Sequence, residues 1–190
     1  GHSAHSSLTH LGLSANMVAV ELMHMLADLS RILFDSPRID ERFDPAHATL
    51  TIGQIQGGTA SNILAAECRF VFDLRTPPSE DPDAILAPFF EECAEISAQM
   101  ADAFPGTGIE IRRISGTPPL MPEEAGAAEA LIRRLTGDNR PATAVPYAAE
   151  AGQFQQAGFS TIICGPGSIE QAHQANEFIA LDQMAKGADF

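Results

Sequence analysis

The chain has 190 residues, 45% of them hydrophobic, which predicts a folded protein with a buried core rather than a disordered chain. Its formal net charge of −14 argues against a nucleic acid or an anionic membrane as a partner, because the phosphates would be repelled. No apolar run approaches the roughly 20 residues that a membrane-spanning helix needs.

The cysteines and the two ends of the chain bear on its origin. Cys68, Cys93 and Cys164 contain no CxxC pair, so neither a disulfide framework nor a structural zinc knot is expected. A reducing cytoplasm is therefore the simplest location. The chain starts at Gly1 without Met and stops at Phe190 inside a predicted helix, so we expect a fragment of a longer protein.

The first predicted element is an amphipathic helix over residues 14–34. Ser14 is a suitable N-cap, and Ser36-Pro37 ends the segment. Apolar residues recur at three- and four-residue spacing, namely Val18, Leu22, Met25, Leu26, Leu29, Ile32 and Leu33.

Two strands follow, over residues 48–55 and 66–75, with a turn at 56–59 between them. The second strand alternates clearly and is closed by Pro77-Pro78. Its apolar face contains Cys68, Phe70, Phe72 and Leu74.

A second helix over residues 82–103 and a short strand over 109–114 complete this part. The order is helix, strand, strand, helix, strand, and a strand before Gly1 would complete a ferredoxin-like two-layer sandwich. We therefore predict an α/β (α+β) fold, with residues 1–115 as its first domain.

Residues 116–190 have a different pattern. Helices are predicted at about 123–136, near 153–156 and from 181, with a strand over 160–164. This pattern resembles the tail of a separate α/β domain whose main body lies outside the chain.

His173 is the first candidate for chemistry, within the stretch GPGSIEQAHQANEF. A loop histidine beside glutamate is more often a surface or capping residue than a ligand. However, it follows a strand end and a Gly-Pro-Gly turn, and imidazole is a common zinc ligand. One histidine cannot build a site, and the chain contains no HxH or HExxH motif.

His2 and His5 lie among serines near the start of the chain. A Ser–His nucleophile pair is one interpretation, but no GxSxG motif surrounds them, so a polar loop is favoured. A histidine that donates a hydrogen bond to an oxyanion remains open. The glycines before Asn62 match no phosphate-binding loop, and a bend that presents the Asn62 side chain is the simpler interpretation.

Arg75 and Glu150 each allow two interpretations. Arg75 is either half of a surface ion pair with Asp73 or a guanidinium that binds a substrate carboxylate. Glu150 is either an acid in a cleft or a residue at a helix N-terminus, and the helix terminus is favoured.

Taken together, these motifs resemble the M20 family of metallo-hydrolases, which are zinc-dependent aminoacylases, deacetylases and peptidases. The resemblance covers essentially the whole chain. GHSAHSS is similar to the start of the family's lid, or dimerisation, domain, GGTASNILAAEC to its GGxxxNxIPxxC segment, and FVFDLR to its next strand. YAAEAGQFQQAG and ICGPGSIEQAHQANEFI are most similar to the acetylornithine deacetylase branch. Leu64-Ala65 departs from the family's Ile-Pro, where proline only stiffens the bend.

The resemblance implies roles near the reacting atoms. His173 would be the last ligand of a two-zinc site, and His5 would reach into the partner subunit's active site and stabilise the oxyanion. The other metal ligands and the catalytic glutamate of the family precede the lid, so they would lie outside this chain.

The resemblance also implies roles in substrate binding. Asn62 and Arg75 would hold the substrate from the lid, with Arg75 facing its carboxylate. Glu150 and the loop from Gly165 to Gly167 would line the cleft from the catalytic side. Charge complementarity adds the hypothesis that Glu150 contacts a substrate ammonium group.

The implied reaction is hydrolysis of an N-acyl amino acid, above all N-acetylornithine in arginine biosynthesis, by a cytoplasmic homodimer that pairs through its lid. Residues 116–190 would belong to the catalytic domain, and the chain alone would be inactive and bind zinc poorly. The alternatives are a non-enzymatic dimerisation module and a related aminoacylase, succinyl-diaminopimelate desuccinylase or carboxypeptidase.

Overall fold

The computed structural model describes residues 1–37 and 40–190. They divide into two compact units, Gly1–Ile114 and Ser115–Phe190. None of the helices in the described ranges is long and apolar enough to cross a membrane.

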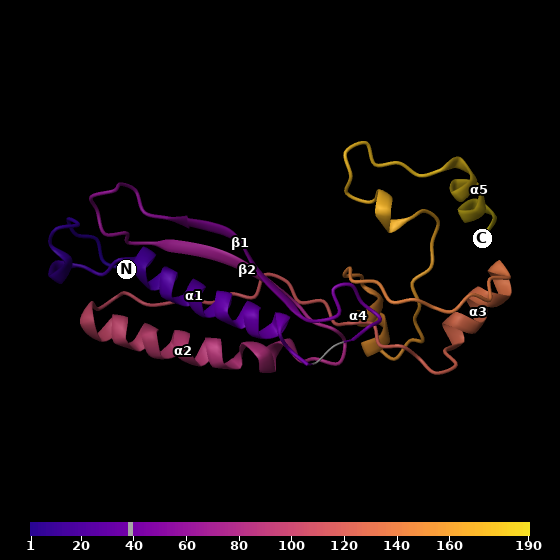
Figure 1. Cartoon of the computed structure of the whole chain (residues 1–190), viewed down its shortest axis with the longest axis horizontal. Coiled ribbons are helices and arrows are strands. Elements are labelled where there is room, and N and C mark those ends of the chain that lie inside the picture. The colour runs from indigo at the N-terminus through magenta and orange to yellow at the C-terminus, as the bar shows by residue number, and fades with distance from the viewer. Residues whose placement is uncertain (38–39) are drawn as a thin grey trace. The chain divides into compact units, whose positions relative to one another are not determined.

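The first unit is a layer of two helices on a two-stranded antiparallel sheet (Figure 1). Helix α1 spans Ala15–Phe34 and α2 spans Pro82–Ala103, while β1 spans Thr49–Gly57 and β2 spans Cys68–Arg75. A short 3-10 helix, η1, spans Thr9–Leu11. The two predicted helices and the two predicted strands of the hairpin are thus confirmed, although β1 continues through Gly57, where a turn was predicted.

The core of the first unit lies between the helices and the sheet. Leu26 of α1 is fully buried, and Phe89 of α2 packs edge-on against Phe72 of β2, with ring centroids 5.7 Å apart. Each such side chain contributes roughly 1.5–3 kcal/mol by leaving water. Burial also raises the pKa of the Cys93 thiol to about 11, so this cysteine is an inert core residue.

The register of the hairpin explains which residues face the helices. Leu50 pairs with Leu74, and Ile52 pairs with Phe72, so one face of the hairpin is apolar. The register then shifts between Ile52 and Gln54. Gly53, between them, is an extra residue in β1 of the kind found in β-bulges.

The strand predicted over residues 109–114 is absent among the described residues. Its first backbone N–H, that of Ile109, donates to Ser97 Oγ of α2 at 2.9 Å instead of to a neighbouring strand. Arg113 also forms an ion pair with Asp83 at the start of α2. In a ferredoxin-like sheet the last strand pairs with the first, and the described residues contain no such strand, so the segment has no ladder to join.

The second unit contains three helices and a single 3-10 turn in its described residues. Helix α3 spans Ala127–Thr136, α4 spans Ala151–Gln156 and α5 spans Leu181–Asp189, while η2 spans Ile169–Gln171. The predicted helices are therefore present, although α3 starts later than residue 123. The strand predicted over 160–164 is wrong, because no other segment of the described chain pairs with it.

Burial differs between the two units. Every buried hydrophobic residue among those described lies between Ala19 and Met100, in the first unit. Large apolar side chains of the second unit remain exposed, including Phe154, Phe159 and Leu181. Polar contacts rather than a hydrophobic core therefore organise the second unit.

Glu123 is the centre of one such set of contacts. Its carboxylate accepts hydrogen bonds from Ser160 Oγ at 2.5 Å, from the Thr161 N–H at 3.0 Å and from Gln155 Nε2 at 3.0 Å. These donors stabilise the charged form, with Ser160 contributing most, and so lower the pKa of Glu123. Glu123 thereby joins the segment before α3 to α4 and to the segment after it.

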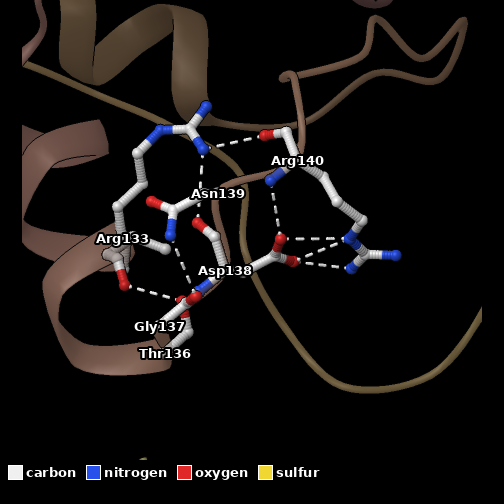
Figure 2. A network of polar contacts seen from close by, with 7 residues as sticks. Arg133, Thr136, Gly137, Asp138, Asn139 and Arg140 are labelled. Atoms are coloured by element: carbon white, nitrogen blue, oxygen red, sulfur yellow. Dashed lines mark hydrogen bonds and ion pairs between the residues drawn. The ribbon is translucent and has the colours of Figure 1, made fainter.

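A second set of contacts fixes the loop after α3 (Figure 2). Gly137 ends the helix in a left-handed conformation at φ 69°. Arg133 Nη1 donates to the carbonyl oxygens of Asp138 and Arg140, at 3.2 and 2.8 Å. The Arg140 guanidinium lowers the pKa of the Asp138 carboxyl to about 2. Arg133 of α3 and Arg140 of the loop thus stabilise the local structure of this loop.

Candidate functional site

The N-terminal segment lies against the loop between β1 and β2, at one end of the first unit (Figure 1). The Leu64 N–H donates to the Ala4 carbonyl at 2.8 Å, and the Ser6 N–H donates to the Asn62 carbonyl at 2.9 Å. These two hydrogen bonds form an isolated antiparallel bridge between His5 and Ile63. The structure therefore brings together the backbone segments that carry the predicted site residues His5 and Asn62, which are 57 residues apart in sequence.

Glycines allow the loop to approach helix α1 closely. Gly58 has a φ of 77°, a backbone conformation that residues with a side chain rarely adopt. A Cβ on Gly57 would lie 2.2 Å from Asn16 Oδ1, in the first turn of α1. Because Gly57 and Gly58 have no side chains, the backbone at this point can pack closely against the side-chain amide of Asn16. Sequence reasoning missed Asn16, since a lone asparagine at a helix start has no distinctive signal.

The His5 ring is held by Ser7, two residues further along. His5 Nδ1 lies 2.8 Å from Ser7 Oγ and 3.2 Å from the Ser7 backbone nitrogen, whose N–H donates to it. The Leu8 N–H closes the turn onto the His5 carbonyl at 2.8 Å. No residue in the described ranges hydrogen-bonds Nε2, so the third group that orients the histidine of a catalytic triad is not found there. Sequence reasoning singled out the serines but not this contact.

Arg75 lies at the opposite end of β2. Strand β2 begins at Cys68, six residues after Asn62 in the sequence, and its eight residues span roughly 23 Å. Arg75 Nε donates to Asp73 Oδ2 at 2.8 Å, and both side chains are exposed. The structure thus does not bring Arg75 to His5 and Asn62, and it pairs the guanidinium with a neighbouring carboxylate.

Glu150 and the Gly165–Gly167 loop belong to the second unit. Glu150 is the exposed residue that precedes α4, and its carbonyl accepts from the Gln153 N–H at 3.0 Å. Gly167 has a φ of 98°, and its N–H donates to Gln183 Oε1 at 3.4 Å. A Cβ on Gly165 would meet open space. Glu150 therefore occupies a helix N-terminus, which was the favoured interpretation of the sequence.

His173 is exposed and has an unusual backbone conformation. Its φ is 60°, a left-handed value for a residue with a side chain. Its N–H donates to Glu177 Oε2 at 3.0 Å. Among the described residues, no group of three or more His, Cys, Asp and Glu side chains could hold a metal ion. His173 therefore stands without companion ligands in this part of the chain.

Comparison with known proteins connects this geometry to a family. Residues 1–101 match the peptidase dimerisation domain of the M20 family. An acetylornithine deacetylase of Pasteurella multocida is 33% identical over 96% of this chain and 46% of its own length. An N-acetyl-L-citrulline deacetylase of Xanthomonas campestris is 32% identical over 71% of this chain and 35% of its own length. The chain thus spans about half the length of the curated relatives, or less.

Solved structures agree with the fold. A tripeptidase of Staphylococcus aureus has a TM-score of 0.66 and an aminopeptidase, PepT, of Bacillus cereus has one of 0.63. Each is 18% identical, with 99% of this chain and 46% of the other chain covered. The predicted α/β lid fold is therefore confirmed. The match over residues 1–101 shows that the chain belongs to the M20 family, whose peptidase dimerisation domain it contains.

Proposed function

We propose that the chain is part of a hydrolase that removes the acyl group from an N-acyl amino acid, with N-acetylornithine in arginine biosynthesis as the substrate. Residues 1–115 would be its lid and 116–190 the C-terminal part of its catalytic domain. The names of the deacetylase relatives support this substrate class. The observation that carries the proposal is the backbone pairing that sets His5 beside Asn62.

His5 and Asn62 would act on the substrate together. The His5 imidazole and the Asn62 amide both offer N–H donors on exposed residues. Donors fixed by a rigid backbone stabilise the oxyanion that forms when an amide carbonyl is attacked. His5 would supply this hydrogen bond to the partner subunit's active site, and Asn62 would hold the substrate beside it.

Arg75 and Glu150 would recognise the charged ends of the substrate. N-acetylornithine has a carboxylate, which Arg75 would bind in place of Asp73, and an ammonium group, which Glu150 would contact. Roughly 23 Å of strand separates Arg75 from the His5 end of the lid, more than an amino acid can bridge. Arg75 and His5 of one chain would therefore serve different active sites of the dimer. The Gly165–Gly167 loop would line the cleft.

The proposed enzyme would use two zinc ions, which would polarise the carbonyl and activate water. His173 would supply one imidazole, whereas a catalytic zinc needs about three protein ligands. By themselves the described residues do not make a zinc centre. The remaining ligands would come from outside this chain, in an N-terminal part, and the enzyme would work in the cytoplasm.

The lid would also form the homodimer. Among the described residues β1 pairs only with β2, so its other edge is free. Edge-to-edge pairing of two copies would cover the unpaired backbone N–H and C=O groups of this edge and generate a two-fold axis. A non-enzymatic dimerisation module is a second candidate, because every buried hydrophobic residue in the described part lies within the matched domain. A related aminoacylase, desuccinylase or carboxypeptidase is a third.

A direct assay separates these candidates. The intact protein that contains this chain is incubated with N-acetylornithine, N-acetylcitrulline, N-succinyl-diaminopimelate and a dipeptide, and the released acid or amino acid is measured. The proposal expects the highest kcat/KM for N-acetylornithine. If none of these substrates is hydrolysed, the dimerisation module is favoured. If another substrate has the highest kcat/KM, that substrate replaces N-acetylornithine in the proposal.

A further inference from the structure

His5 and Ser7 form a contact that bears on how the histidine works. The ring nitrogen Nδ1 lies 2.8 Å from Ser7 Oγ and 3.2 Å from the Ser7 backbone nitrogen. The turn that creates this contact is closed by the Leu8 N–H on the His5 carbonyl. The same turn is anchored to the β1–β2 loop by the Ser6 N–H on the Asn62 carbonyl. The ring is thus oriented by a segment that is itself hydrogen-bonded to the β1–β2 loop.

The two contacts together determine where the proton of the neutral ring resides. A backbone N–H can only donate, so His5 Nδ1 must be the acceptor of the Ser7 N–H. The Ser7 hydroxyl, at the same nitrogen, then also donates. A proton on Nδ1 would break the hydrogen bond from the Ser7 N–H and would turn the Ser7 hydroxyl from a donor into an acceptor. The neutral imidazole therefore carries its proton on Nε2, which no described residue engages.

We propose that Ser7 is a positioning residue that holds His5 in the Nε2–H tautomer, with this N–H free to donate to a substrate oxygen. The inference rests on the proposed role of His5 as an oxyanion donor. Without the contacts from the Ser7 N–H and hydroxyl the ring would sample both tautomers and other orientations, and only the Nε2–H form in the present orientation would be ready to donate. Ser7 itself touches no reacting atom, since its hydroxyl is directed to the opposite nitrogen of the ring.

A spectroscopic experiment tests the tautomer without any need for catalysis. Long-range ¹H–¹⁵N spectra of the 190-residue chain, at a pH where its histidines are neutral, distinguish protonated from unprotonated ring nitrogens. His5→Gln assigns the His5 signals among those of the six histidines. The native chain should show His5 with its proton on Nε2. Ser7→Pro removes the Ser7 N–H that makes Nδ1 an acceptor, and it should shift the signals toward a mixture of tautomers.

Two variants serve as controls. Ser7→Thr keeps a hydroxyl and should retain the native spectrum, whereas Ser3→Ala removes an exposed hydroxyl of the same segment and should change nothing at His5. Circular dichroism of each variant verifies that the fold is intact. A proton on Nδ1 in the native chain would overturn the proposal, as would a tautomer ratio in Ser7→Pro equal to that of the native chain.

Kinetics of the intact protein separate this inference from the proposed function. Ser7→Ala should lower kcat for N-acetylornithine by roughly two- to tenfold, the effect of one hydrogen bond, with little change in KM. Ser7→Thr should restore kcat. If Ser7→Pro alters the tautomer but neither it nor His5→Ala affects kcat, the role of His5 is wrong while the positioning is right. If Ser7→Pro leaves the tautomer unchanged while His5→Ala lowers kcat, only the positioning role of Ser7 is rejected.

Discussion

The backbone N–H of Ser6 donates to the carbonyl of Asn62 at 2.9 Å, and this hydrogen bond connects the two segments that carry the candidate lid residues. It forms because the β1–β2 loop lies close to the first turn of α1 and to the N-terminal segment. The site therefore depends on close backbone packing as much as on the side chains that it presents.

Replacing Gly57 tests this close packing. In Gly57→Ala the new Cβ would lie 2.2 Å from Asn16 Oδ1 and 2.8 Å from Cys68 Sγ, so the backbone or these side chains must shift. We expect a loss of about 1–3 kcal/mol in the free energy of unfolding, as for other overpacked sites. Urea denaturation followed by circular dichroism measures it.

Gly53→Ala is the matched control for Gly57→Ala. Gly53 lies in the same strand, but a Cβ there would meet nothing within 4 Å, so the unfolding midpoint should stay close to that of the native chain. Equal midpoints for both variants would show that the loop does not pack on Asn16 as described.

Glu123 should give the second unit a dependence on pH. Its pKa is lowered below the usual 4.5 by hydrogen bonds from Ser160, Thr161 and Gln155. A lowered pKa in the folded state means that the stabilisation is fully present above about pH 4.5 and is lost as the pH falls through the folded value. The amide proton of Thr161, followed by NMR, should therefore titrate with a midpoint below 4.5.

Two variants check the assignment of this titration. Glu123→Gln should abolish it, because the amide has no charge to lose. Glu124→Gln removes the neighbouring exposed carboxyl and should leave the Thr161 midpoint in place. A Thr161 titration that survives in Glu123→Gln would assign the effect to another group.

How far the sequence could predict this structure depends on the range of the interactions. Helices α1 and α2 were predictable because their apolar residues recur at helical spacing and their hydrogen bonds are internal. The segments 109–114 and 160–164 have strand-like composition, but a strand forms only beside another one. Composition does not supply that neighbour.

The candidate site was predictable to a different degree. The resemblance pointed to His5 and Asn62, but their proximity follows from hydrogen bonds between distant segments, which no spacing rule predicts. The contact between His5 and Ser7 depends on the conformation of a single turn. The separation of Arg75 from Asn62 could have been predicted from the sequence, since the length of a predicted strand sets the distance between its ends. The catalytic, binding and metal roles of all these residues remain predictions.

Glu150 offers a test of substrate recognition in the intact protein. Glu150→Gln should raise KM for N-acetylornithine by about tenfold, since it removes a charged partner of the ammonium group. The side chain of N-acetylcitrulline is uncharged, so KM for that substrate should stay the same. If both KM values rise equally, or if neither changes, Glu150 does not contact the ammonium group.

Zinc binding by the purified 190-residue chain tests the assignment of ligands. After dialysis against metal-free buffer, elemental analysis should find well under one zinc ion per chain, since His173 leaves most coordination positions unfilled. Two tightly bound zinc ions per chain would contradict the view that the other ligands lie outside it.

In the proposed dimer the lid of one subunit completes the active site of its partner through His5, and mixed dimers can reveal whether it does. The His5→Ala and His173→Ala variants of the intact protein should each be nearly inactive alone. When their subunits are exchanged, one of the two sites in each mixed dimer has both a native His5 and a native His173, so hydrolysis of N-acetylornithine should reappear. If the mixed dimers form but remain as inactive as the separate variants, His5 does not act across the interface.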